Sequence, residues 1–531
     1  MLRRLNRCGV VCLLRWLAVL AFTLIVPFKQ SFARDADARQ LAEKLRAATV
    51  RIETPTDLSS GVIVSSNGLI LSVAHGVTAA DRAVTVYLHD GRSFKGRVSF
   101  RNTQLDVAGI QIAAGPQGRL PDPIALQGDT SGPAVHEQRP IVFACGYPAR
   151  ESSGQSPVLR MGRIEAQDKN AIRTSCVLTA GDSGGPLVNS AGRLIGLHRR
   201  IGVGRQVNVH IPVNVVRTAV SRHVELTAPD GHALSSAQFN PTPSEQVSRE
   251  LRLRTAYFYS SSEVESFLAG TWLTPSLVTT KLSELPTEIV ALTCGRSRET
   301  AVGFSQVAVD RQRDLVFVRL HESSDMSVPP IGTPDAAALS VGSIVFSDPR
   351  ASIGIVARTD HQESAVTPRL GVELQLRSGN IFIEKVNPLG AASDAELLPG
   401  DRLMKIADAD LANLNDVASA LSNYQPGDLV VLDVERDEQL FRRIGRLTFS
   451  ANRLLQRANF LVGRAGELSR RRTGFSGVIQ HDANLSPPQM GGPLVNSHGQ
   501  WVGVNIARRG RESVLAIPAD TVARVLKSLT R

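Results

Sequence analysis

Cysteine is scarce in this sequence, which contains only five cysteines among 531 residues. Cys8 and Cys12 lie in the N-terminal segment, so the rest of the chain holds only Cys145, Cys176 and Cys294. Three cysteines cannot form the disulfide framework of a small secreted domain, so hydrophobic cores must stabilise the fold. Cys145 and Cys176 either form one disulfide in an oxidising compartment or remain buried thiols, and the sequence leaves both alternatives open.

Clustered positive charge is also absent. The formal net charge is +11, but five of these charges lie in residues 1–33 and the rest are spread along the chain. Nucleic-acid-binding domains typically gather Lys and Arg on one face, so we expect no nucleic-acid partner. The histidines are scattered without the paired spacing of metal ligands, and no phosphate-binding loop occurs. We therefore expect no metal and no cofactor.

Long apolar runs are confined to the N-terminus. Residues 1–33 combine a basic start, an apolar run from Trp16 to Phe28 and small residues before Ala33, which are the three parts of an export signal. We predict a signal peptide at residues 1–33 and a location in the periplasm or cell envelope. Because a membrane span needs about 20 apolar residues and this run is shorter, with Arg15 directly before it, an uncleaved anchor with peripheral or anchored membrane association is only the alternative.

The pattern of the remaining chain is that of a β protein with several domains. Short apolar or alternating runs separated by Gly, Pro, Asn and Asp fill residues 38–226, which favours an antiparallel barrel or sandwich. Residues 227–249 are polar and loop-like, and we predict a linker there. A new apolar pattern begins near Leu251. A chain of 531 residues also exceeds what one hydrophobic core supports.

An internal repeat organises the chain. The segment GGPLVNSAG at residues 184–192 recurs as GGPLVNSHG at residues 491–499, an offset of 307 without a gap. Upstream, the segment around Asp106 resembles the segment around Asp314, at a smaller offset of 208. The repeat predicts two copies of one fold. Because the offset grows from 208 to 307 along the chain, we predict that an insertion divides the second copy. We place the second copy at residues 250–362 and 449–531, and the insertion at residues 369–448.

The first copy carries the residue types of a serine hydrolase. Amide hydrolysis by a serine needs an imidazole to activate it, a carboxylate to orient the imidazole and N–H donors for the oxyanion. Ser183 lies in the segment GDSGGP, and His75 and Asp106 precede it in the order that chymotrypsin-like enzymes use. We predict His75, Asp106 and Ser183 as the catalytic triad. Glycines allow a sharp turn, so we predict the N–H groups of Gly181 and Ser183 as the oxyanion hole.

These motifs, together with LSVAHG at residues 71–76 and LDVA at residues 105–108, resemble those of the HtrA-type branch of the trypsin-like serine proteases. The resemblance covers residues 38–226 and implies a mostly β, chymotrypsin-like double β-barrel with the triad in the cleft between the barrels. One residue departs from it, since HtrA-type enzymes usually carry Asn at the position of Asp182. In trypsin-like zymogens an aspartate there pairs with a newly cut N-terminus, so the need for an activating partner is left open.

The specificity pocket lies, by the same resemblance, beside His198, Arg199 and Arg200. Glutamyl endopeptidases place a histidine where His198 falls, and an imidazolium with a nearby arginine could neutralise an acidic substrate side chain. The alternative is a surface histidine followed by solvated arginines, with a pocket that prefers small apolar residues. The sequence does not decide between these two pockets.

The insertion at residues 369–448 resembles a PDZ domain of the bacterial protease-associated kind, on LGVEL at residues 370–374 and LPGDRL at residues 398–403. PDZ domains bind an extended peptide as an added strand, and N–H groups near the opening loop receive its terminal carboxylate. Leu370, Gly371 and Val372 occupy that loop. The alternative is that the insertion only packs the two halves together and binds nothing.

The second copy lacks most of the catalytic chemistry. At the matching positions Met490 stands for Ser183, Gln489 for Asp182 and Pro488 for Gly181, and Lys281 falls near the position of His75. Proline has no N–H, so one oxyanion donor is missing as well. Asp314 remains, but an isolated aspartate performs no acyl transfer, and we interpret it as structural. We therefore predict a second, degenerate trypsin-like domain that resembles a pseudoprotease.

Together these observations predict an exported serine endopeptidase. Its substrates would be misfolded or exposed segments of proteins, and its PDZ-like and pseudoprotease modules would bind substrate or regulate access. The principal alternative is a catalytically latent or inactive peptide-binding scaffold or holdase of the cell envelope. A processing protease with one partner would differ only in substrate range. The expected partners are protein or peptide substrates. A homo-oligomer is left open, since HtrA-type proteins commonly form trimers or larger cages.

Overall fold

The structure is a computed structural model that describes residues 35–77, 83–113, 118–128, 139–149, 156–202, 204–221, 241–261, 265–286, 291–322, 327–331, 339–348, 352–388, 390–449 and 467–529. The predicted signal peptide, residues 1–33, lies outside the described residues. The described part is mostly β, as the sequence pattern predicts. Within it no helix combines the length and apolar character that crossing a membrane requires, and no group of three or more His, Cys, Asp or Glu side chains is arranged to hold a metal ion.

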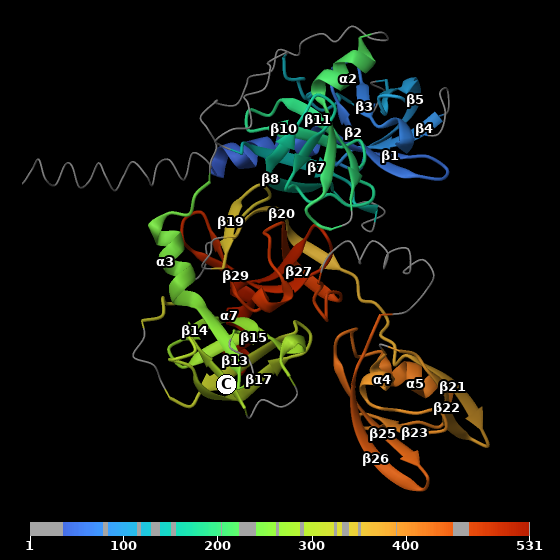
Figure 1. Ribbon diagram of the computed structural model, residues 1–531, viewed down its shortest axis with the longest axis vertical. Helices are drawn as coiled ribbons and strands as arrows, with labels where there is room; N and C mark the ends of the chain where they lie inside the picture. The colour runs from blue at the N-terminus through green and yellow to red at the C-terminus, as the bar shows by residue number, and fades with distance from the viewer. Residues whose placement is uncertain are drawn as a thin grey trace, which may run out of the picture.

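The first six strands close into a barrel in the order β1-β2-β3-β6-β5-β4 (Figure 1). Along β5, buried and exposed side chains alternate with the period of two that a strand with one face in a core requires. A helix over residues 35–48 leads into β1. The strands are β1 (Thr49–Glu53), β2 (Leu58–Ile63), β3 (Leu69–Ser72), β4 (Ala83–Tyr87), β5 (Ser93–Asn102) and β6 (Val107–Gln111).

The next six strands close a second barrel in the order β10-β11-β12-β9-β8-β7. One hydrophobic core joins the two barrels, since Leu71 and Val107 of the first pack in the same cluster as Phe143 and Leu197 of the second. Helix α2 (Val213–Val220) buries one face against this cluster. The strands are β7 (Ile141–Gly146), β8 (Val158–Gln167), β9 (Ile172–Thr174), β10 (Pro186–Asn189), β11 (Leu194–Ile201) and β12 (Asn208–Pro212).

A third and a fourth barrel repeat both strand orders, β13-β14-β15-β18-β17-β16 and β19-β20-β27-β30-β29-β28. Helix α3 (Glu245–Arg254) precedes them and begins inside residues 227–249, which the sequence predicts as a linker. Helix α7 (Ala519–Leu529) follows them. The strands are β13 (Thr255–Ser260), β14 (Leu268–Thr274), β15 (Leu277–Lys281), β16 (Leu292–Gly295), β17 (Val302–Asp310), β18 (Leu315–Leu320), β19 (Ile344–Ser347), β20 (Ser352–Glu363), β27 (Phe475–His481), β28 (Pro493–Asn496), β29 (Trp501–Arg508) and β30 (Val514–Pro518).

The insertion forms a separate sheet in the order β21-β22-β23-β25-β26, with β24 paired to β23. It lies between β20 and β27, which pair with each other in the fourth barrel. In the first copy the equivalent strands β8 and β9 are joined by a tight turn, in which Asp168 N donates to Ala171 O (2.9 Å). The insertion thus replaces a hairpin turn. Its elements are β21 (Val372–Arg377), β22 (Asn380–Val386), α4 (Ala391–Asp394), β23 (Arg402–Ile406), β24 (Ala409–Asp410), α5 (Leu414–Leu421), β25 (Leu429–Arg436) and β26 (Gln439–Arg446).

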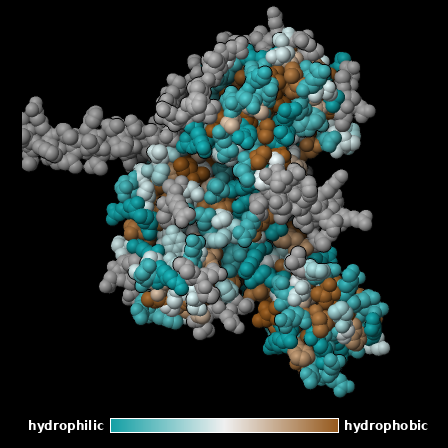
Figure 2. All heavy atoms as spheres, viewed as in Figure 1, coloured by the Kyte–Doolittle hydropathy of each residue, from teal (hydrophilic) through white to brown (hydrophobic). Residues whose placement is uncertain are grey.

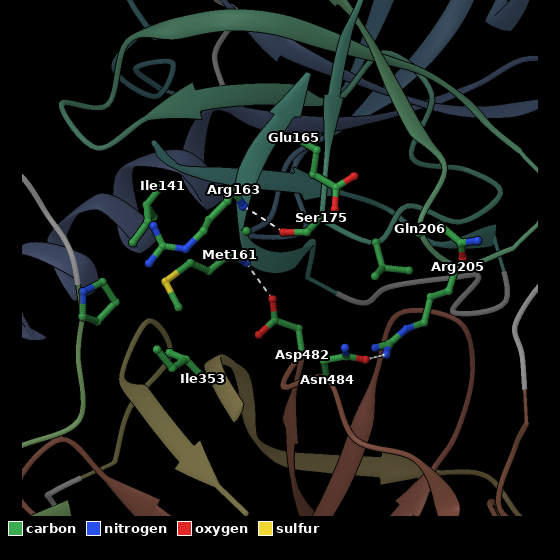
Figure 3. Close-up of a pocket in the computed structure, with 13 residues that line it drawn as sticks. Ile141, Met161, Arg163, Glu165, Ser175, Arg205, Gln206, Ile353, Asp482 and Asn484 are labelled. Atoms are coloured by element: carbon green, nitrogen blue, oxygen red, sulfur yellow. Dashed lines mark hydrogen bonds between the residues drawn. The ribbon is translucent and has the colours of Figure 1, made fainter. Parts of the chain in front are cut away.

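The second barrel packs against the fourth, with β8 and β20 facing each other (Figure 1). Asp482, just after β27, accepts hydrogen bonds from Met161 N (2.6 Å) and Ile355 N (2.7 Å), and so joins both copies (Figure 3). Arg511 Nε donates to Leu178 O across the same interface (2.9 Å). Burial raises the pKa of Asp482 to about 6, although the two N–H donors oppose the shift.

A cavity of about 380 Å³ opens beside these contacts (Figure 3). Its wall includes Met161 and Arg163 from the first copy and Ile353 and Asp482 from the second. Arg205 closes one side and donates from Nε to Arg511 O (2.8 Å). None of the predicted triad residues lines this cavity, so it is separate from the predicted active site.

The three cysteines among the described residues, Cys145, Cys176 and Cys294, are free and buried. Cys145 lies in β7 and Cys176 just after β9, and neither forms a disulfide. Of the two alternatives that the sequence leaves open, the structure therefore has buried thiols. Burial raises the pKa of Cys145 to about 11 and that of Cys176 to about 12, so both are uncharged at neutral pH. They pack as small apolar side chains of the barrel cores.

We expect the substitution Asp482→Asn to flatten the pH dependence of stability. The carboxyl group titrates at about 6 in the folded protein, but near about 4 in an unfolded chain. Its protonated form is therefore favoured by folding, and the stability that it contributes at low pH is lost as the pH rises from about 4 to about 6. This loss amounts to at most about 3 kcal/mol.

The measurement is urea unfolding between about pH 4 and about pH 7. The free energy of unfolding should fall less steeply with pH in Asp482→Asn than in the unmodified protein. The exposed Asp437 serves as the control, since Asp437→Asn should leave the slope unchanged. Equal slopes in the unmodified protein and in Asp482→Asn would contradict the assignment.

Candidate active site

His75 and Asp106 form a hydrogen-bonded pair at one end of the first barrel. His75 lies in the short 3-10 helix η1 (Ala74–Gly76), directly after β3. Its Nδ1 lies 3.0 Å from both carboxylate oxygens of Asp106, and Asp106 Oδ1 also accepts a hydrogen bond from His75 N (3.1 Å). Because Nδ1 faces two oxygens, we assign the ring proton to it, which leaves Nε2 as a base. The His75 side chain is 49% exposed and therefore accessible to a substrate.

Asp106 holds this turn with its backbone as well as its side chain. Its φ is +59°, a left-handed conformation that aspartate tolerates better than most residues. Its carbonyl oxygen accepts from Ala74 N (3.2 Å), and its Oδ2 accepts from Arg199 Nε (3.3 Å). Burial alone would raise the pKa of Asp106, but the hydrogen bonds and charge of His75 and the hydrogen bond from Arg199 hold it below its ordinary value. Asp106 is therefore a carboxylate at neutral pH.

The loop that carries Ser183 belongs to the second barrel but packs on the first. Ser60, in β2, donates from its N to Ser183 O (2.8 Å) and from its Oγ to Gly181 O (2.8 Å). Gly184 lies so close to β3 that a Cβ there would be 2.2 Å from Ser72 Oγ, so only glycine fits. Since His75 follows β3 directly, these contacts bring the Ser183 loop to the same seam between the barrels as the His75–Asp106 pair.

The turn at Ser183 leaves two N–H groups free. Gly181 has a φ of +95°, and the carbonyl of Ala180 is turned away to accept from Ala149 N (2.7 Å). The N–H of Asp182 bonds to Thr179 O (3.2 Å). By contrast, the N–H groups of Gly181 and Ser183 have no acceptor within the described part of the chain. They are available to hydrogen-bond an oxyanion.

Asp182 has a buried partner that the sequence analysis missed. Arg160 in β8 places its Nη2 3.1 Å from Asp182 Oδ2, and Thr179 N donates to the same oxygen (2.7 Å). Burial raises the pKa of Asp182 to about 6, although the charge of Arg160 opposes the shift. No motif surrounds Arg160 in β8. Its contact with Asp182 therefore becomes visible only in the assembled barrel.

The predicted pocket residues lie in three different environments. His198 is buried, and its Nδ1 is 3.0 Å from Nδ1 of His210, whose Nε2 lies 2.8 Å from Thr174 Oγ1. Burial lowers the pKa of His198 well below its ordinary value and that of His210 to about 3, so both rings are neutral. The imidazolium of the first alternative is therefore absent at neutral pH, and His198 is not the surface histidine of the second alternative. Arg199 contacts Asp106, and Arg200 is exposed.

The second copy preserves the turn of Asp106 without its histidine. Asp314 has a φ of +58°, its carbonyl accepts from Leu282 N (2.9 Å), and its Oδ1 accepts from Ser283 N (2.8 Å). Ser283 thus occupies the backbone position of His75, two residues beyond the position near Lys281 that the sequence analysis gives. The offset of 208 that relates the two aspartates would have located it. Lys281 instead pairs with Asp314 in the core, with Nζ 2.7 Å from Oδ2.

The second copy also lacks the free N–H groups. The 3-10 helix η5 (Pro487–Gln489) replaces the open turn, and Met490 N donates to Pro487 O (3.0 Å). Proline at position 488 has no N–H to offer. Met490 is fully buried, at the place where Ser183 stands in the first copy. This loop therefore has neither a nucleophile nor an oxyanion donor.

The inserted sheet offers an open edge beside its predicted carboxylate loop. Strand β21 pairs only with β22 among the described strands. Gly371 has a φ of +79°, and a Cβ there would lie 2.7 Å from Gly390 Cα, so the loop requires glycine. Within the described residues the N–H groups of Leu370 and Gly371 have no acceptor. The face in Figure 2 shows hydrophobic patches on this domain, and Leu376 in β21 is 47% exposed.

Comparisons with known proteins match two parts of the chain. Residues 59–197 match the trypsin-like peptidase domain, and residues 368–441 match the PDZ domain. The serine endoprotease DegS of Haemophilus influenzae is 31% identical over 158 residues, 29% of this chain and 44% of that protein. The putative serine protease HhoA of Synechocystis is 35% identical over 150 residues, covering 27% and 36%. The serine protease HTRA1 of Xenopus laevis is 30% identical over 212 residues, covering 36% and 42%.

The chain spans less than half the length of each of these relatives. A solved structure of the serine endoprotease from Yersinia pestis matches with a TM-score of 0.30 and 15% identity, over 78% of this chain and 98% of that chain. The first two barrels are thus a trypsin-like peptidase domain, and the inserted sheet is a PDZ domain. The chain is similar to HtrA-type serine proteases in these two parts.

The two aspartates offer a matched test, because both adopt a left-handed conformation that asparagine also tolerates. We expect Asp106→Asn to lower kcat/KM roughly 10 000-fold, since the amide would favour the wrong tautomer of His75, and to leave Tm nearly unchanged. We expect Asp314→Asn to leave kcat unchanged but to destabilise the fold by roughly 3–5 kcal/mol, since Lys281 would lose its buried counterion. Similar effects of both substitutions on activity would contradict the assignment.

Proposed function

We propose that this protein is a serine endopeptidase with Ser183 as its nucleophile. The observation that carries the proposal is the His75–Asp106 pair, whose Nδ1 is bonded to the carboxylate and whose ring is exposed beside the Ser183 loop. The two free N–H groups of that loop supply the other requirement of acyl transfer. These two features come from separate barrels, and the packing of the loop on β2 and β3 supports their assembly into one site.

The chemistry follows from the protonation states of these groups. His75 Nε2 accepts the proton of Ser183 as its Oγ attacks the peptide carbonyl carbon. The N–H groups of Gly181 and Ser183 stabilise the tetrahedral oxyanion, and the imidazolium then protonates the leaving amine. Water repeats the sequence on the acyl-enzyme and releases the product. Asp106 stays ionised throughout, because its pKa is held below its ordinary value.

We propose that the second copy is a pseudoprotease that holds the PDZ domain. Arg446 of the inserted domain donates from Nη1 to Ser283 O (2.8 Å), in the segment that corresponds to the His75 turn. Arg471 lies 3.7 Å from Asp428 of the insertion, and its carbonyl accepts from Lys281 Nζ (2.8 Å). The inserted domain thus contacts the second copy at the positions that correspond to the proposed active site of the first copy.

We propose that the PDZ domain captures an extended peptide along β21. The free strand edge would add the peptide as a further strand, and the unbonded N–H groups of Leu370 and Gly371 would receive its terminal carboxylate. Substrates are then protein segments with accessible ends or unfolded stretches. We place the protein in the periplasm or cell envelope on the basis of the predicted export signal. One relative, from Haemophilus influenzae, is described as a probable periplasmic serine protease.

Cleavage of casein by the full chain tests the catalytic assignment. We expect Ser183→Ala to abolish cleavage and to prevent labelling by a fluorophosphonate, because both reactions require the Oγ of Ser183 as the nucleophile. Met490→Ala, at the equivalent position of the second copy, should leave kcat unchanged. Cleavage that survives Ser183→Ala would refute the assignment. A folded, unmodified protein without cleavage would favour a peptide-binding scaffold.

Binding of a labelled peptide with an apolar C-terminus and a free carboxylate tests the PDZ assignment. We expect Gly371→Ala to weaken binding at least tenfold, since the added Cβ would meet the Gly390 backbone. Gly379 has a similar φ of +78° but open space around its Cα, so Gly379→Ala controls for backbone strain alone. The same peptide with an amidated end should bind weakly. Equal affinities for both peptides would contradict carboxylate capture.

A further inference from the structure

A fully buried ion pair lies directly beside the proposed nucleophile. The side chains of Arg160 and Asp182 are 0% and 1% exposed, with Nη2 and Oδ2 3.1 Å apart. Burying either charge alone would be very costly, so each side chain requires the other. Arg160 belongs to β8, and Asp182 to the loop after β9, so the pair ties the loop to the body of the second barrel.

The pair fixes the backbone on both sides of Asp182. The carboxylate packs so closely on β7 that a Cβ at Gly146 would be 2.5 Å from Asp182 Oδ1. With the side chain held inside the barrel, the carbonyl of Asp182 accepts from Gly185 N (2.9 Å) and its N–H bonds to Thr179 O (3.2 Å). The residues on either side of Asp182 are Gly181 and Ser183, and their N–H groups have no acceptor in the described residues. The conformation that frees them therefore depends on the inward position of Asp182.

The second copy shows the same loop without the pair. By strand register Ser352 takes the position of Arg160, and Gln489 takes that of the aspartate. Gln489 accepts at its Oε1 from Ser486 N (2.8 Å) in its own loop, and its Nε2 donates to Asp348 Oδ2 (2.7 Å) just after β19. The backbone closes into a 3-10 turn, and the N–H of Met490 is used up inside it. Loss of the ion pair and loss of the open turn thus occur together.

We propose that Arg160 is a positioning residue of the active site, whose ion pair with Asp182 holds the two oxyanion-binding N–H groups in their open arrangement. It would take the part that a newly cut N-terminal ammonium plays in trypsin-like zymogens. Arg160 touches no substrate and acts only through Asp182. The inference rests on the proposed peptidase function, and it means that the catalytic loop needs no cleavage of the chain to become competent.

The test compares full-chain variants by kinetics on a peptide substrate and by affinity for a peptide boronic acid. The boronate adduct with Ser183 places an oxygen in the oxyanion hole, so its affinity reports the two N–H groups directly. We expect Arg160→Met to lower kcat at least about 100-fold, to change KM less than about threefold and to weaken boronate binding in parallel. Arg163→Met, three residues further along β8, is the control and should change neither.

The double variant Arg160→Met with Asp182→Asn separates positioning from stability. Because it removes both charges of the pair, it should fold and recover about tenfold in kcat over the single variant, while staying about tenfold below the unmodified enzyme. This comparison decides the question even if Arg160→Met alone does not fold.

Two results would overturn the proposal. One is a folded Arg160→Met, or a folded double variant, with the kcat and boronate affinity of the unmodified enzyme. The other is a fall in kcat without weaker boronate binding. Failure of the peptidase function itself would be seen separately, in the unmodified protein and in Ser183→Ala.

Discussion

The close approach of a glycine to a neighbouring strand allows the two barrels of each copy to pack together. In the first copy Gly184 lies on β3, and a Cβ there would be 2.2 Å from Ser72 Oγ. In the second copy Gly491 makes the equivalent contact, with a Cβ placed 2.2 Å from Thr280 Oγ1. The contact thus persists where the nucleophile has been lost. These glycines are required by the packing of one barrel on the other, and the proposed active site of the first copy depends on that packing.

The sequence predicted features that depend on local pattern or on repetition. Alternating strands, the GDSGGP turn and the offset of 307 indicated a β protein with two copies, and the structure has four barrels with matching strand orders. The paired position of His75 and Asp106 could also be expected, because both belong to recognisable segments. The role of Arg199 at Asp106 could not, since nothing in the sequence brings β11 to the turn before β6.

Buried polar partners were the hardest features to predict. Arg160 and His210 are each flanked by apolar residues along their strands, and both are buried. A single sequence does not show which polar partner lies opposite each of them inside the barrel. The histidine pair also changes the interpretation of His198, because burial removes the charge that its sequence context suggested. In each case desolvation decides the property of the side chain, and desolvation is known only once the strands are assembled.

The two copies are joined at the strand that supports the catalytic loop. Met161, the residue after Arg160, donates its N–H to the buried Asp482 of the second copy. The inserted domain in turn contacts the second copy at Ser283. Hydrogen bonds to backbone groups therefore link the first copy to the second, and the second copy to the PDZ domain. Because the bonded groups of Met161 and Ser283 belong to the backbone, these links do not depend on the side chains of those two residues.

The insertion has ends that meet, because Arg369 N donates to Thr448 O (2.9 Å) and Thr448 N donates to Arg369 O (3.0 Å). A barrel whose strands β20 and β27 are separated by residues 364–474 would otherwise have to close a very long loop before its sheet could form. Once the inserted sheet has folded from its own contiguous residues, that loop is reduced to residues 364–368 on one side and 449–474 on the other, and its closure entropy falls accordingly. A folded inserted domain therefore lowers the entropic cost of forming the fourth barrel.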